Sequence, residues 1–236
     1  MRLFLSNDTS APYAALLPDD SHHCIRVLRM GLGDELWVTS GNGTMCHARI
    51  SSPDDKCCEV EITERIADYQ PRPFRLCLAV APTKNTARLE WLIEKAVEIG
   101  IDRITPVICH HSERTTLKTD RLNKIALSAM KQSLKALRPQ IDDPLPLADF
   151  LHRQSTAEPD CQKFVCHCAE GDRQSLHQLY SPGRDATVLI GPEGDFSSNE
   201  IDLALSCGFR PVTLGQSRLR TETAALYAVT VLNFMN

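Results

Sequence analysis

The chain lacks the features that mark membrane, secreted and metal-binding proteins. No apolar run among its 236 residues approaches the roughly 18 residues that a membrane-spanning helix needs, and the polar N-terminus does not have the pattern of a signal peptide. The ten cysteines are scattered and include no Cys-x-x-Cys pair, so neither a disulfide framework nor a zinc-finger spacing is present. These absences predict a cytoplasmic protein with free thiols and no membrane partner.

One short cluster of metal-binding residue types is present, Cys166-His167-Cys168. We expect residues 163–169 to form a strand, in which successive side chains point to opposite faces. Cys166 and Cys168 would then share one face while His167 points to the other, an arrangement that does not close a tetrahedral site. The sequence therefore predicts buried thiols in this segment and no bound metal.

The sequence also lacks an overall excess of basic residues, because its formal net charge is −4. The charge is unevenly spread, however, and residues 71–140 contain 13 Lys/Arg against 6 Asp/Glu. Several of these cations, Lys131 and Arg138 among them, recur at i+3 or i+4 spacing along a helix that we expect at residues 120–137. Such spacing is typical of a phosphate-binding surface and also of a solvated helix face.

Two patterns of predicted secondary structure divide the chain near residue 70. Before it, short strands alternate with turns, and Gly41-Asn42-Gly43 is a hairpin signal. After the proline-containing segment 69–73, strands alternate with helices, which predicts a parallel sheet covered on both faces. We therefore expect a small β-rich domain at residues 1–70 and an α/β domain at residues 74–236. The expected strands are 35–40, 45–50, 57–62, 75–81, 105–110, 163–169, 186–190 and 210–214, and the expected helices include 86–99.

A glycine-containing loop follows the expected strand at residues 186–190. It reads Gly191-Pro192-Glu193-Gly194, and Ser197 with Glu200 then forms a Ser-x-x-Glu capping box that begins a helix. Glycine in such a loop lets backbone amides approach a ligand closely. The same pattern also occurs in tight strand-to-helix turns that bind nothing.

A second loop, residues 215–220, follows the expected strand 210–214 and precedes a helix for which Thr221 is the expected N-cap. Glu222 in the first turn suits the helix dipole, but Arg218 and Arg220 add positive charge to its positive end. This conflict favours a substrate-facing role for at least one of the two arginines over a solvated loop.

Taken together, these segments resemble the SPOUT superfamily of knotted RNA methyltransferases, through Gly-Pro-Glu-Gly at 191–194 and Leu-Arg-Thr-Glu-Thr-Ala at 219–224. Within it they resemble the RsmE family, which methylates N3 of a uridine in 16S ribosomal RNA. Residues 22–30 are similar to the N-terminal His-x-x-x-Val-Leu-Arg segment of that family, and Lys84 with Arg88 and residues 94–100 match the start of its catalytic domain. The resemblance implies a PUA-like β-barrel followed by a SPOUT domain with a C-terminal trefoil knot.

The resemblance also implies which residues bind the cofactor, which act in catalysis and which contact RNA. S-adenosylmethionine would be held by the two loops, at Gly191, Glu193, Gly194, Leu214, Gly215 and Leu219. Arg220 would stabilise negative charge on the uracil carbonyls, and Glu193 or Glu222 would accept the proton. RNA would contact His23, Arg26, Arg29, Lys84, Arg88, Lys131, Arg138 and Arg218.

The implied partners are 16S ribosomal RNA within the small subunit and a second copy of the chain in a homodimer. Two other functions stay open: methylation of a ribose 2′-hydroxyl, and RNA binding without chemistry.

Overall fold

The computed structural model describes residues 2–156, 160–169, 171 and 173–236. Two compact units make up the chain. The first unit contains Met1–Pro71 and Met130–Arg138, and the second contains Arg72–Ala129 and Pro139–Asn236. Residues 130–138 thus belong to the first unit, although in sequence they lie within the second.

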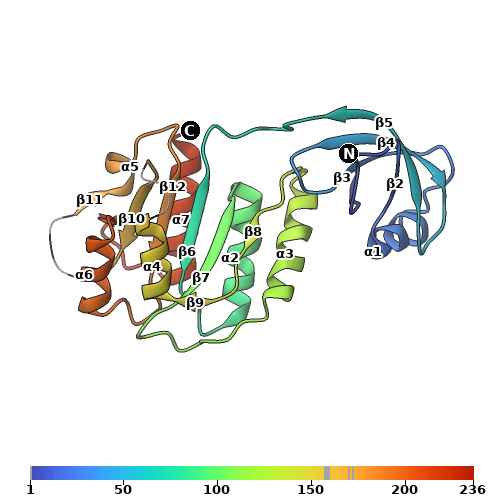
Figure 1. Cartoon of the computed structure of the whole chain (residues 1–236). Helices are drawn as coiled ribbons and strands as arrows, with labels where there is room; N and C mark the ends of the chain where they lie inside the picture. Colours follow the sequence, from blue (N-terminus) through green and yellow to red (C-terminus); the bar gives the residue numbers. More distant parts are fainter. Residues whose placement is uncertain (1, 157–159, 170, 172) are drawn as a thin grey trace. The chain divides into compact units, whose positions relative to one another are not determined.

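The first unit is built on a curled five-stranded sheet (Figure 1). Its order is β1 (Leu3–Leu5), β3 (Glu35–Thr39), β4 (Met45–Ser52), β5 (Glu59–Ile66) and β2 (Tyr13–Ala15). β3 and β4 pair antiparallel on either side of residues 41–43, which confirms the predicted hairpin. A bridge between Ser6 and Leu16 joins the ends of the edge strands β1 and β2. The sheet therefore closes into a small barrel, and its core includes Phe4, Leu36 and Val60.

A short helical segment of the first unit carries the predicted RNA-binding residues near position 25. Helix α1 (Pro18–His22) continues into a π-helical turn, η1 (His23–Val27). Arg29 follows it with a positive φ of 56°, which is uncommon for a residue other than glycine. The sequence pattern does not predict this helical segment.

The second unit is built on a parallel sheet, and every strand pairing described in it is parallel. Parallel strands place their carboxyl ends at one edge of the sheet, where the loops into the helices begin. The order is β11 (Gln174–Ser175), β13 (Arg210–Thr213), β10 (Gln162–Cys166), β12 (Ala186–Ile190), β6 (Leu76–Val80), β7 (Arg103–Ile108) and β8 (Gln140–Ile141), with β9 (Leu145–Pro146) also on β7.

Helices cover both faces of this sheet, which confirms the predicted α/β class (Figure 1). Helices α2 (Thr86–Ile99) and α7 (Thr221–Phe234) pack against each other on one face, and α4 (Leu147–Thr156) and α6 (Ser198–Ser206) lie on the other. The remaining helices are α3 (Thr119–Gln132) and α5 (Leu176–Leu179). Within the described ranges no helix has both the length and the apolarity that crossing a membrane requires.

Helix α3 ends earlier than the sequence predicted. It stops at Gln132 rather than near residue 137, because Leu134 takes a left-handed conformation with φ of 57°. The amides of Leu134 and Lys135 donate to the carbonyls of Lys131 and Met130, which is the hydrogen-bond pattern of a Schellman cap. Arg138 is therefore not on the helix, and the predicted basic face is shorter than expected.

Candidate cofactor and RNA site

A cavity of about 680 Å³ lies where the carboxyl ends of β10, β12 and β13 meet. This is the edge at which open α/β sheets bind ligands, and the volume falls in the range of small-molecule sites. Three segments line it: residues 166–168 with Arg173 after β10, residues 190–193 with Asp195 after β12, and residues 212–221 with Ala224 after β13.

The loop after β12 is held in shape by its own side chains. A Cβ atom on Gly191 would lie 2.9 Å from the ring of Phe196, so the close packing of this turn requires glycine. Ser197 and Glu200 form the predicted capping box, with both reciprocal contacts present. The sequence therefore identified correctly how the strand passes into helix α6.

Asp195 joins the loop after β12 to the loop after β10. Its carboxylate accepts hydrogen bonds from the amide of Cys168 at 2.7 Å and from its own neighbour, the amide of Phe196, at 2.9 Å. The backbone of Asp195 is left-handed, with φ of 61°, a conformation that aspartate tolerates better than most residues. Asp195 thus holds the loop after β10 and the loop after β12, two walls of the cavity, in contact with each other.

The loop after β13 is tied back to β12 at the start of α7. The Thr221 hydroxyl donates to the carbonyl of Gly191 at 3.0 Å in a buried position. The predicted N-cap role of Thr221 is wrong, because Arg220 occupies the cap position and Thr221 is the first helical residue. Arg218 and Arg220 are exposed on the cavity lining, and no ion pair to either arises from the described residues.

The segment after β10 departs from the prediction. The strand ends at Cys166, so His167 and Cys168 lie in a loop, and all three residues of the cluster line the cavity. Burial raises the pKa of the Cys166 thiol to about 12, whereas Cys168 is exposed rather than buried. Burial lowers the pKa of His167, and the nearby Arg173 guanidinium lowers it further. Over the part of the chain that the structure describes, no three such side chains are grouped to hold a metal.

Most of the predicted cofactor residues meet at this cavity. Its lining includes Gly191, Glu193, Leu214, Gly215 and Leu219, together with Arg218 and Arg220. Gly194 is outside the lining, and a Cβ atom there would lie 3.0 Å from the Cβ of His111. The sequence did not predict three further residues of the lining, His167, Arg173 and Asp195. The position of His167 after an apolar strand was a signal that could have identified it.

The two candidate proton acceptors occupy different environments. Glu193 is exposed on the cavity lining, and its Oε1 accepts the amide hydrogen of Lys84 at 3.0 Å. Glu222 is only 7% exposed and does not line the cavity. Its Oε1 lies 3.6 Å from the Nε of Arg88, and its Oε2 is buried without a partner.

The remaining predicted RNA contacts belong to the first unit. The ammonium of Lys131 lies 2.5 Å from a carboxylate oxygen of buried Asp20, and Arg26 is paired with Asp55 at 2.6 Å. His23 and Arg29 are exposed. Arg138 donates its backbone amide to the carbonyl of Gly41. RNA binding by these residues stays a prediction.

The fold defines an α/β protein of two parts, in which a small barrel precedes a parallel sheet with helices on both faces. The cavity at the carboxyl edge of this sheet has the size of a cofactor-binding site. Residues 70–233 match the family model described as an RNA methyltransferase domain, and residues 16–63 match the RNA methyltransferase PUA domain. The barrel is therefore PUA-like, and the α/β unit is an RNA methyltransferase domain.

Individual relatives agree with the family models. The ribosomal RNA small subunit methyltransferase E of Mesomycoplasma hyopneumoniae is 32% identical over 177 residues, which are 73% of this chain and 75% of that protein. A crystal structure of a probable rRNA-methyltransferase from Porphyromonas gingivalis is 39% identical, with a TM-score of 0.92 over 100% of this chain and 98% of that one. A Legionella pneumophila structure in complex with the bound cofactor S-adenosylmethionine is 28% identical, with a TM-score of 0.87 over 99% and 97%. The chain belongs to the ribosomal RNA small subunit methyltransferase E family.

Proposed function

We propose that the protein transfers the methyl group of S-adenosylmethionine to N3 of a uridine in 16S ribosomal RNA of the small subunit. The observation that carries this proposal is the cavity, whose lining includes Glu193, Arg218, Arg220 and further residues of both glycine-containing loops. The Legionella relative, which was solved with S-adenosylmethionine bound, supports the same cofactor here.

The cavity suits a ligand that has apolar, polar and charged parts. Ile190, Val212 and Leu219 supply apolar lining, and the loop amides supply polar groups for an adenine and a ribose. A Cβ atom on Gly215 would meet nothing within 4 Å, so this turn leaves open space for a ligand. S-adenosylmethionine, when bound, supplies a methyl carbon on a sulfonium leaving group.

The residues of the chain would orient the uracil and remove its proton. N3 of uracil carries a hydrogen that must leave as the nitrogen–methyl bond forms and the sulfur–methyl bond breaks. We assign the proton to Glu193, because its carboxylate lines the cavity and, among the described residues, only the amide of Lys84 donates to it, at Oε1. Arg220 is permanently charged and would stabilise negative charge on the uracil carbonyls. Glu222 is not assigned as the base because it is buried away from the cavity lining.

A homodimer is part of the proposal. Helices α2 and α7 carry apolar side chains that are exposed: Trp91 and Ile99 on α2, at 44% and 37%, and Tyr227 and Phe234 on α7, at 45% and 90%. Exposed apolar groups gathered on neighbouring helices are typical of an interface, and we assign it to a second copy. Because the proposed substrate is ribosomal RNA, we expect the protein to act in the cytoplasm.

Calorimetric titration of S-adenosylmethionine tests the cofactor site. Ala224 lines the cavity from the first turn of α7, so Ala224→Trp should fill the space and reduce affinity by at least a hundredfold. Ala148 is exposed on α4, outside the lining, and Ala148→Trp should bind like the wild type. Position 194 is less suitable, because a side chain there meets His111 first.

Nucleoside analysis of 16S RNA and of small-subunit particles after reaction identifies the product. We expect 3-methyluridine. A 2′-O-methylated nucleoside would instead establish the ribose reaction, and RNA binding without S-adenosylmethionine binding would establish a non-catalytic protein.

A further inference from the structure

Three buried side-chain atoms of the described residues have no hydrogen-bond partner: Nε of Arg114, Nε of Arg173 and Oε2 of Glu222. Such atoms are rare in native proteins and each needs a reason. All three residues follow strands of the parallel sheet at its carboxyl edge, after β7, β10 and β13 respectively. Arg173 lines the cavity and Glu222 faces Arg88, whereas Arg114 is outside the cavity lining.

Arg114 is held against the loop that precedes α2. Its Nη2 donates to the carbonyl of Lys84 at 3.0 Å, and the amide of Lys84 donates in turn to Glu193 on the cavity lining. The ammonium of Lys84 lies 2.7 Å from the carboxylate of Glu113, the neighbour of Arg114. Arg114 is therefore two hydrogen bonds away from the proposed proton acceptor.

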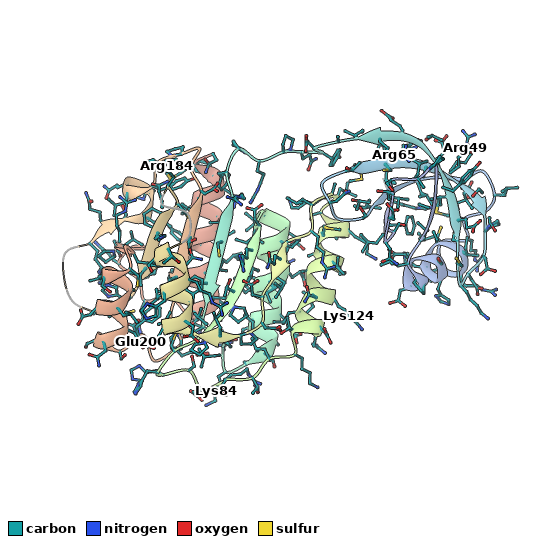
Figure 2. The ribbon with its side chains drawn as sticks, viewed as in Figure 1. Arg49, Arg65, Lys84, Lys124, Arg184 and Glu200 are labelled. Atoms are coloured by element: carbon teal, nitrogen blue, oxygen red, sulfur yellow. The ribbon has the colours of Figure 1, made fainter. Side chains whose placement is uncertain are left out.

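The loop that carries Arg114 is also hydrogen-bonded to the loop after β12 and to the first turn of α6. The His110 amide donates to Glu200 at 2.7 Å, and Nδ1 of His111 lies 3.0 Å from the carbonyl oxygen of Asp195. Because a carbonyl only accepts, that ring nitrogen carries the hydrogen. Figure 2 shows Lys84 and Glu200 at the same end of the sheet, with Arg184 at the opposite end. These bonds fix Arg114 beside the cavity rather than in free solvent.

The charge of Arg114 is not balanced by any carboxylate that the structure describes. Nearby cations are paired, Lys84 with Glu113 and Arg121 with Glu90. No carboxylate of the described residues forms an ion pair with Arg114, although the side chain is half-buried. A guanidinium that is partly desolvated and lacks a counter-ion favours an external anion.

The strand order indicates which ligand brings that anion. The cofactor cavity is formed after β13, β10 and β12, and β6 and β7 continue the sheet on the other side of β12. The loops after β6 and β7 therefore begin next to the cavity at the same edge of the sheet, and none of their described residues belongs to its lining, which leaves them available to the methyl acceptor. We propose that Arg114 binds a backbone phosphate of the RNA at the target nucleotide, an inference that rests on the proposed function.

Binding of a 16S RNA fragment measured over a range of salt concentrations tests the proposal. Removing one phosphate contact should reduce the slope of log affinity against log salt by about one. We expect Arg114→Gln to show this reduction and to weaken binding about tenfold, and Arg114→Lys to keep the slope. Arg184, exposed and paired with Asp160 at the opposite edge of the sheet, provides the matched control, and Arg184→Gln should change neither quantity.

Two further measurements keep the outcomes separate. Titration with S-adenosylmethionine should give the wild-type affinity in every variant, which shows that the fold is intact. If Arg114→Gln fails this check, Arg114→Met takes its place, because methionine fills the space of the arginine stem without charge. In turnover, the neutral variant should raise KM for RNA about tenfold and leave kcat unchanged.

An unchanged salt slope in the neutral variant would overturn the proposal, and so would a lower kcat at unchanged KM, which would place Arg114 on the uracil instead. A wild type that binds neither S-adenosylmethionine nor RNA would overturn the proposed function and this inference together. A wild type that methylates RNA while the neutral variant does so equally well would overturn only the inference.

Discussion

Among the ten cysteines, Cys57 in the first unit and Cys168 on the cavity lining are exposed. Burial raises the pKa of four others, Cys58, Cys77, Cys109 and Cys166, to about 12. A raised pKa keeps these groups in the thiol form until the pH approaches 12. Since the thiolate is the reactive form, alkylation near pH 8 should distinguish the exposed cysteines from the buried ones.

This difference allows the cofactor site to be mapped chemically. At pH 8, iodoacetamide should modify Cys57 and Cys168 first, and saturating S-adenosylmethionine should slow the modification of Cys168 at least tenfold. Cys57 is the internal control and should react at the same rate with or without the ligand. Peptide mass spectrometry measures both rates. Equal rates at Cys168 with and without bound ligand would contradict the placement of the cofactor in this cavity.

At this scale, the sequence predicted those residues of the cavity lining that belong to a local sequence pattern. Glu193, Gly215 and Arg220 stand in short segments where glycine and charge interrupt an apolar pattern. Arg114 and Arg173 could not be found in this way. What distinguishes them is a buried nitrogen without a partner, and this arises only when segments far apart in the sequence are packed together.

One element of the second unit depends on a single glycine. Gly100 ends helix α2 with φ of 138°, and a Cβ atom there would lie 2.6 Å from Nη1 of Arg72 and 2.8 Å from Oδ1 of Asn233. Arg72 binds both Asn233 of α7 and Asp102 at the start of β7. The turn after α2 is thus the point where three elements are joined.

Gly100→Ala should therefore destabilise the second unit by about 2 kcal/mol, from backbone strain and displacement of Arg72. Thermal and urea unfolding followed by circular dichroism would measure the change. Gly31→Ala is the control, because a Cβ atom there meets nothing within 4 Å and its φ is not positive. If the Gly100→Ala protein were as stable as the wild type, the Arg72 side chain would be able to move aside without a loss of stability.

Long helices and strands were easier to predict from the sequence than short ones. Helix α2 was predicted at residues 86–99 and is observed at Thr86–Ile99, because 14 residues give several turns of apolar periodicity. Strands of two or three residues, such as β8 and β2, contain no period to detect. The end of α3 was missed because Leu134 occupies a left-handed position that usually takes glycine.

For the molecule as a whole, the apolar side chains exposed on α2 and α7 lead to a prediction about assembly. The wild type should sediment as a dimer at micromolar concentration, and Tyr227→Glu should shift it toward the monomer by placing a charge among these side chains. Tyr13→Glu alters a tyrosine that is 62% exposed in the first unit and should leave the dimer intact. Analytical ultracentrifugation separates the two results, and a monomeric wild type would reject the interface.

The family resemblance also implies how the chain is threaded. A trefoil knot cannot be read from the order of strands and helices, because that order is the same whether or not the C-terminal segment passes through a loop. Knots are rare enough that general rules of topology exclude them. The knot stays a prediction that rests on the resemblance, whereas the parallel sheet and a small β-rich domain were predicted from the residues themselves.

The hydrogen bond between Glu193 and the amide of Lys84 joins the wall of the cavity to the loop before α2, which under our proposal faces the RNA. A ligand that moves the Glu193 carboxylate therefore changes both the cavity and the loop that contains Lys84. Thermodynamic linkage then requires reciprocity: whatever factor S-adenosylmethionine applies to the affinity for RNA, the RNA applies to the affinity for S-adenosylmethionine. The supply of methyl donor would in this way influence how tightly the protein binds its RNA, before any methyl group is transferred.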